Sequence, residues 1–143
     1  MTGFVNLGDG LDETSVASEA LVFMVVGPQG HWKMPIAYFL IKSLTPDTQM
    51  VLLQHALEVL HKRSIKVVCV TMDGHLSNIS MCTMLGCQLK LNPLKPLRTY
   101  FAQPSSGEKV FVMMDPCHML KLTRNMLQAY GSINSPVGIV KWS

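Results

Sequence analysis

Charge is scarce in this sequence. Charged residues make up 15% of the 143-residue chain, and the net charge is only +3. Composition therefore does not indicate the concentrated Lys/Arg patch that by itself would mark a nucleic-acid-binding protein. Hydrophobic residues make up 48% and the mean hydropathy is positive, which is high for a soluble domain of this size. The chain is long enough for one domain, and its apolar excess indicates either a large interior or a surface meant for a partner.

Paired cysteine motifs are also missing. The chain has no Cys-x-x-Cys pair and no Cys-His spacing that matches a zinc module; its four cysteines are Cys69, Cys82, Cys87 and Cys117. This pattern favours reduced thiols in an intracellular protein over a disulfide framework.

Long apolar runs are absent as well. The longest, Ala20 to Val26, is about a third of the ~20 residues that a membrane-spanning helix needs. The first residues, Met1 to Phe4, lack the basic and apolar regions of a signal peptide. We expect no membrane partner and a nuclear or cytoplasmic location.

Two apolar runs near the N-terminus predict an antiparallel hairpin. They are Ala20–Val26 and Trp32–Ile41, and the glycines and proline of Gly27–Gly30 supply the turn. The next segment, Thr45-Pro46-Asp47, has the hydroxyl cap, proline and acid of a helix start. The helix carries an apolar stripe that we expect to face the core, namely Met50, Leu53, Leu57 and Leu60. Strand, helix and strand in this order predict a right-handed crossover and a mixed sheet, antiparallel at the hairpin and parallel beyond it.

Two later strands end in carboxylates. Ile65–Met72 predicts a strand that is buried on both faces and delivers Asp73 to an edge of the sheet, and Val110–Met114 ends in Asp115. Open α/β sheets bind ligands beyond the carboxyl ends of their strands, which makes both acids candidate site residues. Asp73 is either a ligand for a hard divalent cation such as Mg²⁺ or an ordinary Asp-Gly turn.

Two further helices follow these strands. Ser77 or Asn78 could cap a short helix that runs through Leu85 and ends at Gly86.

The other helix, from about residue 116 to 130, closes at Gly131. Its apolar side consists of Met119, Leu122, Met126 and Tyr130, and we expect the methionines of this side to pack on the core. A polar ridge of His118, Lys121 and Asn125 is either a phosphate-binding surface near the helix start or a solvated face. The tail, residues 132–143, shows no clear closing element.

Four blocks of sequence together carry a family resemblance. They are Ala17–Gly27, Gly30–Phe39, Val70–Gly74 with Asn78, and Asp115–Lys121 with Arg124 and Asn125. In this order they resemble the P-element family of DNA transposases, close to the THAP-type transposases of vertebrates. The resemblance implies an α/β class with an incomplete ribonuclease H-like fold. It also implies a partial catalytic domain over residues 1–131 and a tail, residues 132–143, at the start of the family's GTP-binding insertion.

The resemblance also implies a role for Asp73. In the family an acidic triad binds Mg²⁺ and drives DNA cleavage and strand transfer, and Asp73 matches the second acid of that triad. The first acid would precede this chain, and Asp9, Asp12 and Glu13 do not match it. The last acid would follow an insertion that starts near Trp142. We therefore expect one of three metal ligands, Asp73, and no independent transposase activity.

GTP is the second cofactor that the resemblance implies. Asp115 and Lys121 would contact the nucleotide in the intact family, and this chain alone would bind it weakly or not at all. DNA is the family's partner, although the sequence contains no THAP-type zinc finger. Two alternatives are a domesticated, non-catalytic module that binds a protein or itself through an exposed sheet edge, and a fragment that never folds stably.

Overall fold

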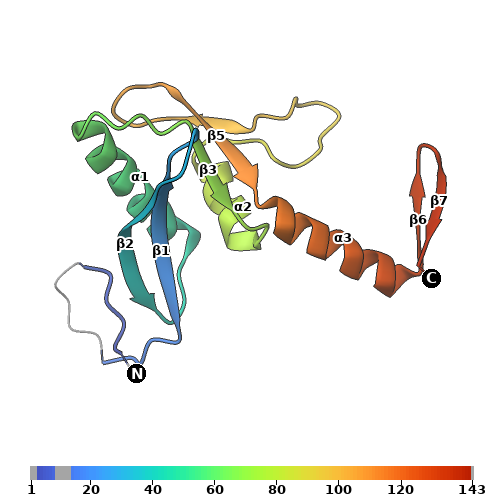
Figure 1. Cartoon of the computed structure of the whole chain (residues 1–143), viewed down its shortest axis with the longest axis horizontal. Helices are drawn as coiled ribbons and strands as arrows, with labels where there is room; N and C mark the ends of the chain where they lie inside the picture. Colours follow the sequence, from blue (N-terminus) through green and yellow to red (C-terminus); the bar gives the residue numbers. More distant parts are fainter. Residues whose placement is uncertain (1–2, 9–13, 143) are drawn as a thin grey trace. The chain divides into compact units, whose positions relative to one another are not determined.

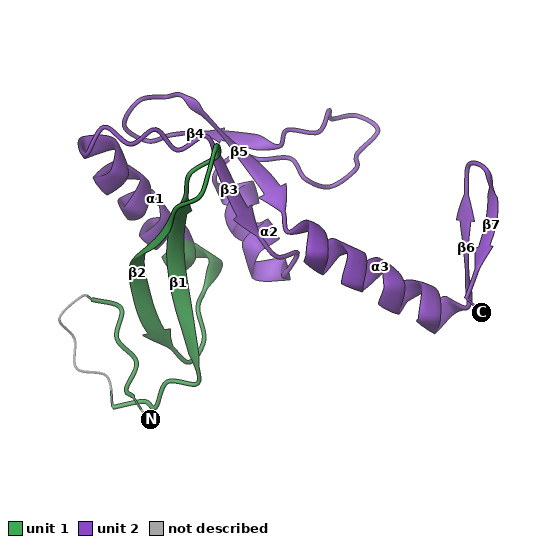
Figure 2. Cartoon of the chain, in the orientation of Figure 1, with its two compact units in different colours: residues 1–49 green, residues 50–143 purple. Residues whose placement is uncertain are grey.

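The computed structural model describes residues 3–8 and 14–142, which form a mixed α/β structure (Figure 1). Asp9, Asp12 and Glu13 lie outside the described residues. The chain divides into two compact units, residues 1–49 and residues 50–143 (Figure 2). In the described part of the chain, no helix combines the length and the apolar character needed to cross a membrane.

The first unit contains the predicted hairpin. Strands β1 (Glu19–Val26) and β2 (Lys33–Ile41) pair antiparallel, so this prediction is confirmed. The pairing slips by one residue at Ile36, because Phe23 pairs with Ala37 while Met24 pairs with Pro35. Proline cannot donate a ladder hydrogen bond, so a position beside a bulge suits it.

Helix α1 (Pro46–Lys62) begins where the sequence predicts. The Thr45 hydroxyl accepts a hydrogen bond from the Thr48 backbone N–H at 3.2 Å, as an N-cap residue does. Of the predicted apolar stripe, three residues are buried and Met50 is half-buried; the buried residues are Leu53, Leu57 and Leu60.

The second unit is organised by a three-stranded mixed sheet. It consists of β3 (Cys69–Met72), β5 (Lys109–Met114) and β4 (Tyr100–Ala102), in that order. Strand β3 runs parallel to β5, and β4 runs antiparallel to it. The antiparallel hairpin and a mixed sheet with parallel strands agree with the predicted fold class. The hairpin, however, forms a separate two-stranded sheet in the described residues, so the prediction that one sheet contains both is wrong.

One face of this sheet is a core surface. Phe101 of β4 and Val110 of β5, which pair with each other, are both fully buried. Helix α2 (Leu76–Met84) contacts the sheet through Cys82, whose Sγ lies 3.6 Å from Sδ of Met72. Side chains alternate along strands, so the next residues in sequence point to the opposite face. That second face is open to solvent.

Strand β3 is shorter and less buried than predicted. The strand begins only at Cys69. Val68, the residue before the strand, is 47% exposed, and Thr71 within the strand is also exposed. In the described residues β3 pairs on one side only, with β5, and the sheet is covered on one face only. The predicted burial on both faces is therefore wrong, because burial requires a covering layer that the strand's own sequence does not specify.

Helix α2 starts slightly earlier than the sequence suggests. Its N-cap is His75, whose ring Nδ1 accepts from the Ser77 backbone N–H at 3.3 Å, so the predicted caps Ser77 and Asn78 are wrong. The predicted end is confirmed, since Gly86 has φ +99°, a conformation that strongly favours glycine.

Helix α3 (Pro116–Tyr130) has the predicted bounds, including Gly131 at φ +70° as its C-cap. The expectation that the methionines of its apolar side pack on the core is wrong, because no described residue of α3 is buried. Tyr130 is 76% exposed and Leu122 is 44% exposed. Met119, near the start of α3, packs closely against Gly74.

The tail forms an element that the sequence did not indicate. Strands β6 (Ser132–Ser135) and β7 (Gly138–Lys141) pair as an antiparallel hairpin. The Ser135 side chain stabilises the turn, because its hydroxyl donates to the Gly138 carbonyl at 2.8 Å and accepts from the Val137 N–H at 3.3 Å. The prediction that the tail lacks a closing element is wrong.

Candidate active site

Asp73 and Asp115 emerge at the same edge of the three-stranded sheet. They directly follow Met72 and Met114, which are partners in the parallel β3–β5 ladder. The Asp115 backbone N–H donates to the Met72 carbonyl at 2.8 Å, so the pairing continues past the last strand residue. The carboxyl ends of parallel strands are where open α/β sheets bind ligands.

The Asp73 carboxylate is fixed by the turn that follows it. Its Oδ1 accepts the His75 backbone N–H at 3.0 Å and the Asn78 side-chain amide at 2.6 Å. An Asx turn of this kind positions an aspartate between a strand and a helix. Asp73 itself is exposed to solvent.

The pKa of Asp73 is lowered by these surroundings. The His75 backbone hydrogen bond is the largest cause; partial burial opposes it, while the Asn78 hydrogen bond and the charges of His118 and His75 add to the lowering. Each favourable contact stabilises the charged carboxylate. Asp73 is therefore an anion at neutral pH.

Asp115 has a different structural role from Asp73. Its Oδ1 accepts the Cys117 backbone N–H at 3.0 Å, and Pro116 occupies the first turn of α3. This is the arrangement of an N-cap residue, and a carboxylate also suits the positive end of the helix dipole. Asp115 is half-buried. The carboxylate therefore already occupies the helix N-terminus, where the sequence interpretation placed a phosphate.

The predicted ridge on α3 is divided in the structure. His118, in the first turn, is half-buried and its charge acts on Asp73. Asn125 accepts two hydrogen bonds at Oδ1 from the neighbouring Arg124 guanidinium. Lys121 is exposed. The structure thus connects His118 with Asp73 but connects Asn125 with its own helix.

His75 is the residue that sequence reasoning missed. It caps α2 with its ring, donates its backbone N–H to Asp73, and lies 2.8 Å from the Ser77 hydroxyl through Nδ1. The available signal was its place two residues after an aspartate, the spacing of an Asx turn.

The described donors do not make up a metal centre. No group of three or more His, Cys, Asp or Glu side chains in the described residues is arranged to hold a metal ion. One oxygen of Asp73 accepts two hydrogen bonds, and Asp115 is committed to a helix cap. Magnesium sites commonly use one or two carboxylates with further oxygen ligands. Asp73 could supply one ligand, but the described residues do not fit a complete two-metal site.

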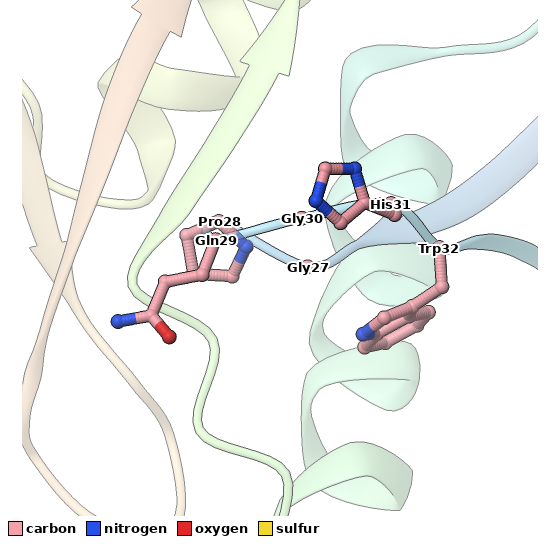
Figure 3. Close-up of a pocket in the computed structure, with 6 residues that line it drawn as sticks. All are labelled: Gly27, Pro28, Gln29, Gly30, His31 and Trp32. Carbon is pink, nitrogen blue, oxygen red and sulfur yellow. The ribbon is translucent and has the colours of Figure 1, made fainter.

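A second candidate lies at the turn of the hairpin (Figure 3). Residues 27–32 line an open hollow of about 520 Å³. Trp32 packs over Gly27, where an added Cβ would lie 2.6 Å from the indole nitrogen, yet Trp32 is 53% exposed. Figure 3 shows the His31 and Trp32 rings pointing in different directions. The lining therefore does not converge on one point as a catalytic site would.

The fold and its acidic edge define an α/β domain of the ribonuclease H-like class. A family model described as TNP-like, RNase H N-terminal domain, matches residues 1–86, and the chain belongs to this family.

Two proteins and one solved structure are similar to the chain. The human DNA transposase THAP9 is 33% identical over 145 residues, covering 99% of this chain. The Transposable element P transposase of Drosophila melanogaster is 30% identical over 103 residues, covering 71% of this chain. The chain spans only 16% and 12% of the lengths of these relatives.

The solved structure is the Drosophila P element transposase strand transfer complex. It matches with a TM-score of 0.70 and 23% identity, and the match covers 99% of this chain and 29% of that chain. This likeness supports the fold. The predicted resemblance to P-element transposases is confirmed by the family and its relatives together.

Proposed function

We propose that this chain is part of the catalytic core of a P-element-like DNA transposase, in which Asp73 is a catalytic carboxylate and Mg²⁺ ligand. The observation that carries the proposal is the place of Asp73 at the carboxyl end of β3, held by His75 and Asn78 in its charged form. The relatives are named as transposases. Carboxylates at such an edge suit metal-assisted phosphoryl transfer.

We further propose that the chain does not cleave DNA on its own. Two-metal catalysis needs several carboxylates acting as a unit, and the described residues offer Asp73 without a second uncommitted acid beside it. The test is a Mg²⁺-dependent cleavage assay on DNA with terminal inverted repeats. We expect no cleavage by the chain and none by Asp73→Ala. Robust cleavage that Asp73→Ala abolishes would refute the proposed inactivity.

The ligand role of Asp73 is tested separately from catalysis. Titration with Mn²⁺, a paramagnetic substitute for Mg²⁺, should broaden the backbone NMR signals around Asp73 at millimolar metal. Asp73→Asn should abolish this broadening, whereas Asp47→Asn, which removes an exposed acid in the first turn of α1, should leave it unchanged. Equal broadening in wild type and Asp73→Asn would argue against the ligand role.

For the nucleotide, we propose that Asp115 and Lys121 contact GTP only in a longer transposase and that this chain binds GTP weakly or not at all. Asp115 is engaged as the cap of α3, and Lys121 stands on an exposed helix face. Calorimetry with GTP and Mg²⁺ should give no saturable heat in the micromolar range.

A role in DNA transposition is consistent with a nuclear or cytoplasmic location.

The alternative function is a domesticated interaction module that pairs through a sheet edge. Strand β3 bonds to β5 on one side only within the described residues, and an unpaired strand edge invites another strand. Sizing chromatography should then show self-association or a complex. A clean monomer with one cooperative unfolding transition would count against this alternative.

A further inference from the structure

The solvent-exposed face of β4 and β5 gathers aromatic and basic side chains. Tyr100 pairs with Phe111 across the two strands, and their rings make an edge contact with centroids 5.9 Å apart. Phe111 is 49% exposed although it lies in the middle of a strand. Exposed aromatic rings on an open sheet are unusual unless something covers them.

Two cations lie on the same aromatic ring of this face. The Arg98 guanidinium carbon is 5.0 Å from the Tyr100 ring centroid, and Nζ of Lys109 is 4.5 Å from it. Both contacts are within cation–π range and hold the charges in place. The ring therefore brings two like charges together on a surface where an anion would be attracted to both.

No acid in the surrounding segment is engaged with these cations. Residues 74–114 contain four Lys or Arg residues and a single acid, Glu108. Glu108 forms an ion pair with Lys66 instead, and no other side-chain ion pair is present among the described residues. The positive charge of Arg98 and Lys109 is therefore available to an anionic partner, although the net charge of the whole chain is small.

We propose that this face binds a single strand of DNA, with Phe111 stacked on a base and with Arg98 and Lys109 on the flanking phosphates. Aromatic platforms flanked by basic residues are the usual means of holding single strands without sequence preference. The chemistry specifies a single-stranded nucleic acid; the choice of DNA rests on the proposed transposase function.

The position of this face within the sheet fits that proposal. Phe111 and Met113 point to the open side of β5, and Met113 is paired with the exposed Thr71 of β3. These are the last outward positions before Asp115 and Asp73. A single strand of DNA that lies along this face would run toward Asp73 and Asp115, which is where a transposase would act on the DNA.

Binding is tested with the full chain and a fluorescent 12-nucleotide oligo-dT by polarisation, in EDTA so that metal and cleavage play no part. Arg98→Gln/Lys109→Gln should weaken binding about tenfold. It should also flatten the slope of log affinity against log salt by about 1.4, because each phosphate contact on a single strand contributes about 0.7. The matched control Lys62→Gln/Lys141→Gln removes two exposed cations elsewhere and should change affinity less than about threefold.

The stacking role is tested with Phe111→Leu, which keeps an apolar side chain and removes the ring. We expect about a tenfold loss of affinity, while Met113→Leu on the same face should have little effect. Circular dichroism and thermal melts confirm that each variant is folded.

Equal losses in the two double variants, unchanged affinity in Phe111→Leu, or no binding of oligo-dT at all would each overturn the proposal. If sizing chromatography shows an oligomer that Phe111→Leu converts to a monomer, the face is a contact between copies and the proposal fails. If an oligo-U of the same length bound about tenfold more tightly than the oligo-dT, the choice of DNA would be refuted. Because no metal is present, none of these outcomes bears on the ligand role of Asp73.

Discussion

The Asn78 side-chain amide donates to Oδ1 of Asp73, the same oxygen that accepts the His75 backbone N–H. One carboxylate oxygen is thus held from the helix side, and the orientation of the Asp73 carboxylate is set before any ligand arrives. Preorganisation of this kind is what a metal-binding or catalytic carboxylate requires. The hydrogen bond from Asn78 should also affect the pKa of Asp73, so replacing Asn78 tests this contact.

Asn78→Ala should raise the pKa of Asp73, because it removes a hydrogen bond to the charged form. The measurement is an NMR titration of the Asp73 carboxyl carbon. Asn125→Ala on α3 is the matched control and should leave this titration unchanged. If the titration of Asp73 is the same in wild type and Asn78→Ala, the hydrogen bond does not act as described.

The same contacts predict how stability depends on pH. The folded pKa of Asp73 is below its unfolded value, so its stabilisation is complete above the ordinary carboxyl range and is lost as the pH falls through the lowered pKa. When the pH falls below about 4, the free energy of unfolding should therefore decrease less in Asn78→Ala than in wild type. Urea unfolding at pH 7 and at pH 3 tests this, and parallel pH profiles would contradict it.

Gln103 is the polar side chain whose loss should cost the most. It is 6% exposed, its Oε1 accepts the backbone N–H groups of Ser105 and Ser106, and its Nε2 donates to the Leu57 carbonyl at 3.4 Å. Gln103→Ala leaves these groups without partners and should reduce the free energy of unfolding by about 2 kcal/mol. Gln128→Ala, on the exposed side of α3, should change it by less than about 0.5 kcal/mol. If Gln103→Ala and Gln128→Ala lowered the free energy of unfolding equally in urea, the hydrogen bonds of Gln103 would not stabilise the fold as described.

Gly86→Ala should destabilise the chain, because Gly86 has φ +99° after α2. A left-handed conformation costs an alanine about 1–2 kcal/mol. Gly30→Ala is the matched control, since nothing lies within 4 Å of the added Cβ and Gly30 is not in the left-handed region; its thermal midpoint should stay at or above the wild-type value. A lower midpoint in Gly30→Ala than in Gly86→Ala would reverse the prediction.

Cys82 should be the least reactive cysteine. It is fully buried, and burial raises the pKa of its thiol to about 11, so almost no thiolate exists at pH 8. Cys117 is exposed. Iodoacetamide followed by mass spectrometry should label Cys117 first and Cys82 only after unfolding in urea. Labelling of both at similar rates in the native protein would show that α2 opens readily.

Local signals predicted the elements whose ends are encoded in a few neighbouring residues. The β1–β2 hairpin follows from its glycine-rich turn, α1 from Thr45-Pro46-Asp47, and the end of α3 from Gly131. The β6–β7 hairpin was missed because its turn, Pro136-Val137, lacks the Asn-Gly or Asp-Gly signal of tight hairpins. Burial of β3 and α3 was overestimated because an apolar sequence does not specify its covering layer.

The candidate site divides in the same way. The position of Asp73 at a strand end could be predicted from the run of apolar residues before it, and the Asx turn involves residues only two and five positions away. The influence of His118 on Asp73 depends on the packing of α3, which begins 40 or more residues later in the chain. The convergence of Arg98 and Lys109 on Tyr100 depends on the β4–β5 register. No local pattern carries such information.

The pairing of Met72 with Met114 also limits how this chain can change in length during evolution. An insertion or deletion of one residue within β3 or β5 would move one carboxylate by about 3.3 Å along the edge and turn it to the other face of the sheet. The connection between the two strands, residues 73–108, carries loops that can lengthen or shorten without disturbing that pairing. Related sequences should therefore differ in length in these loops while the two strands keep a constant length.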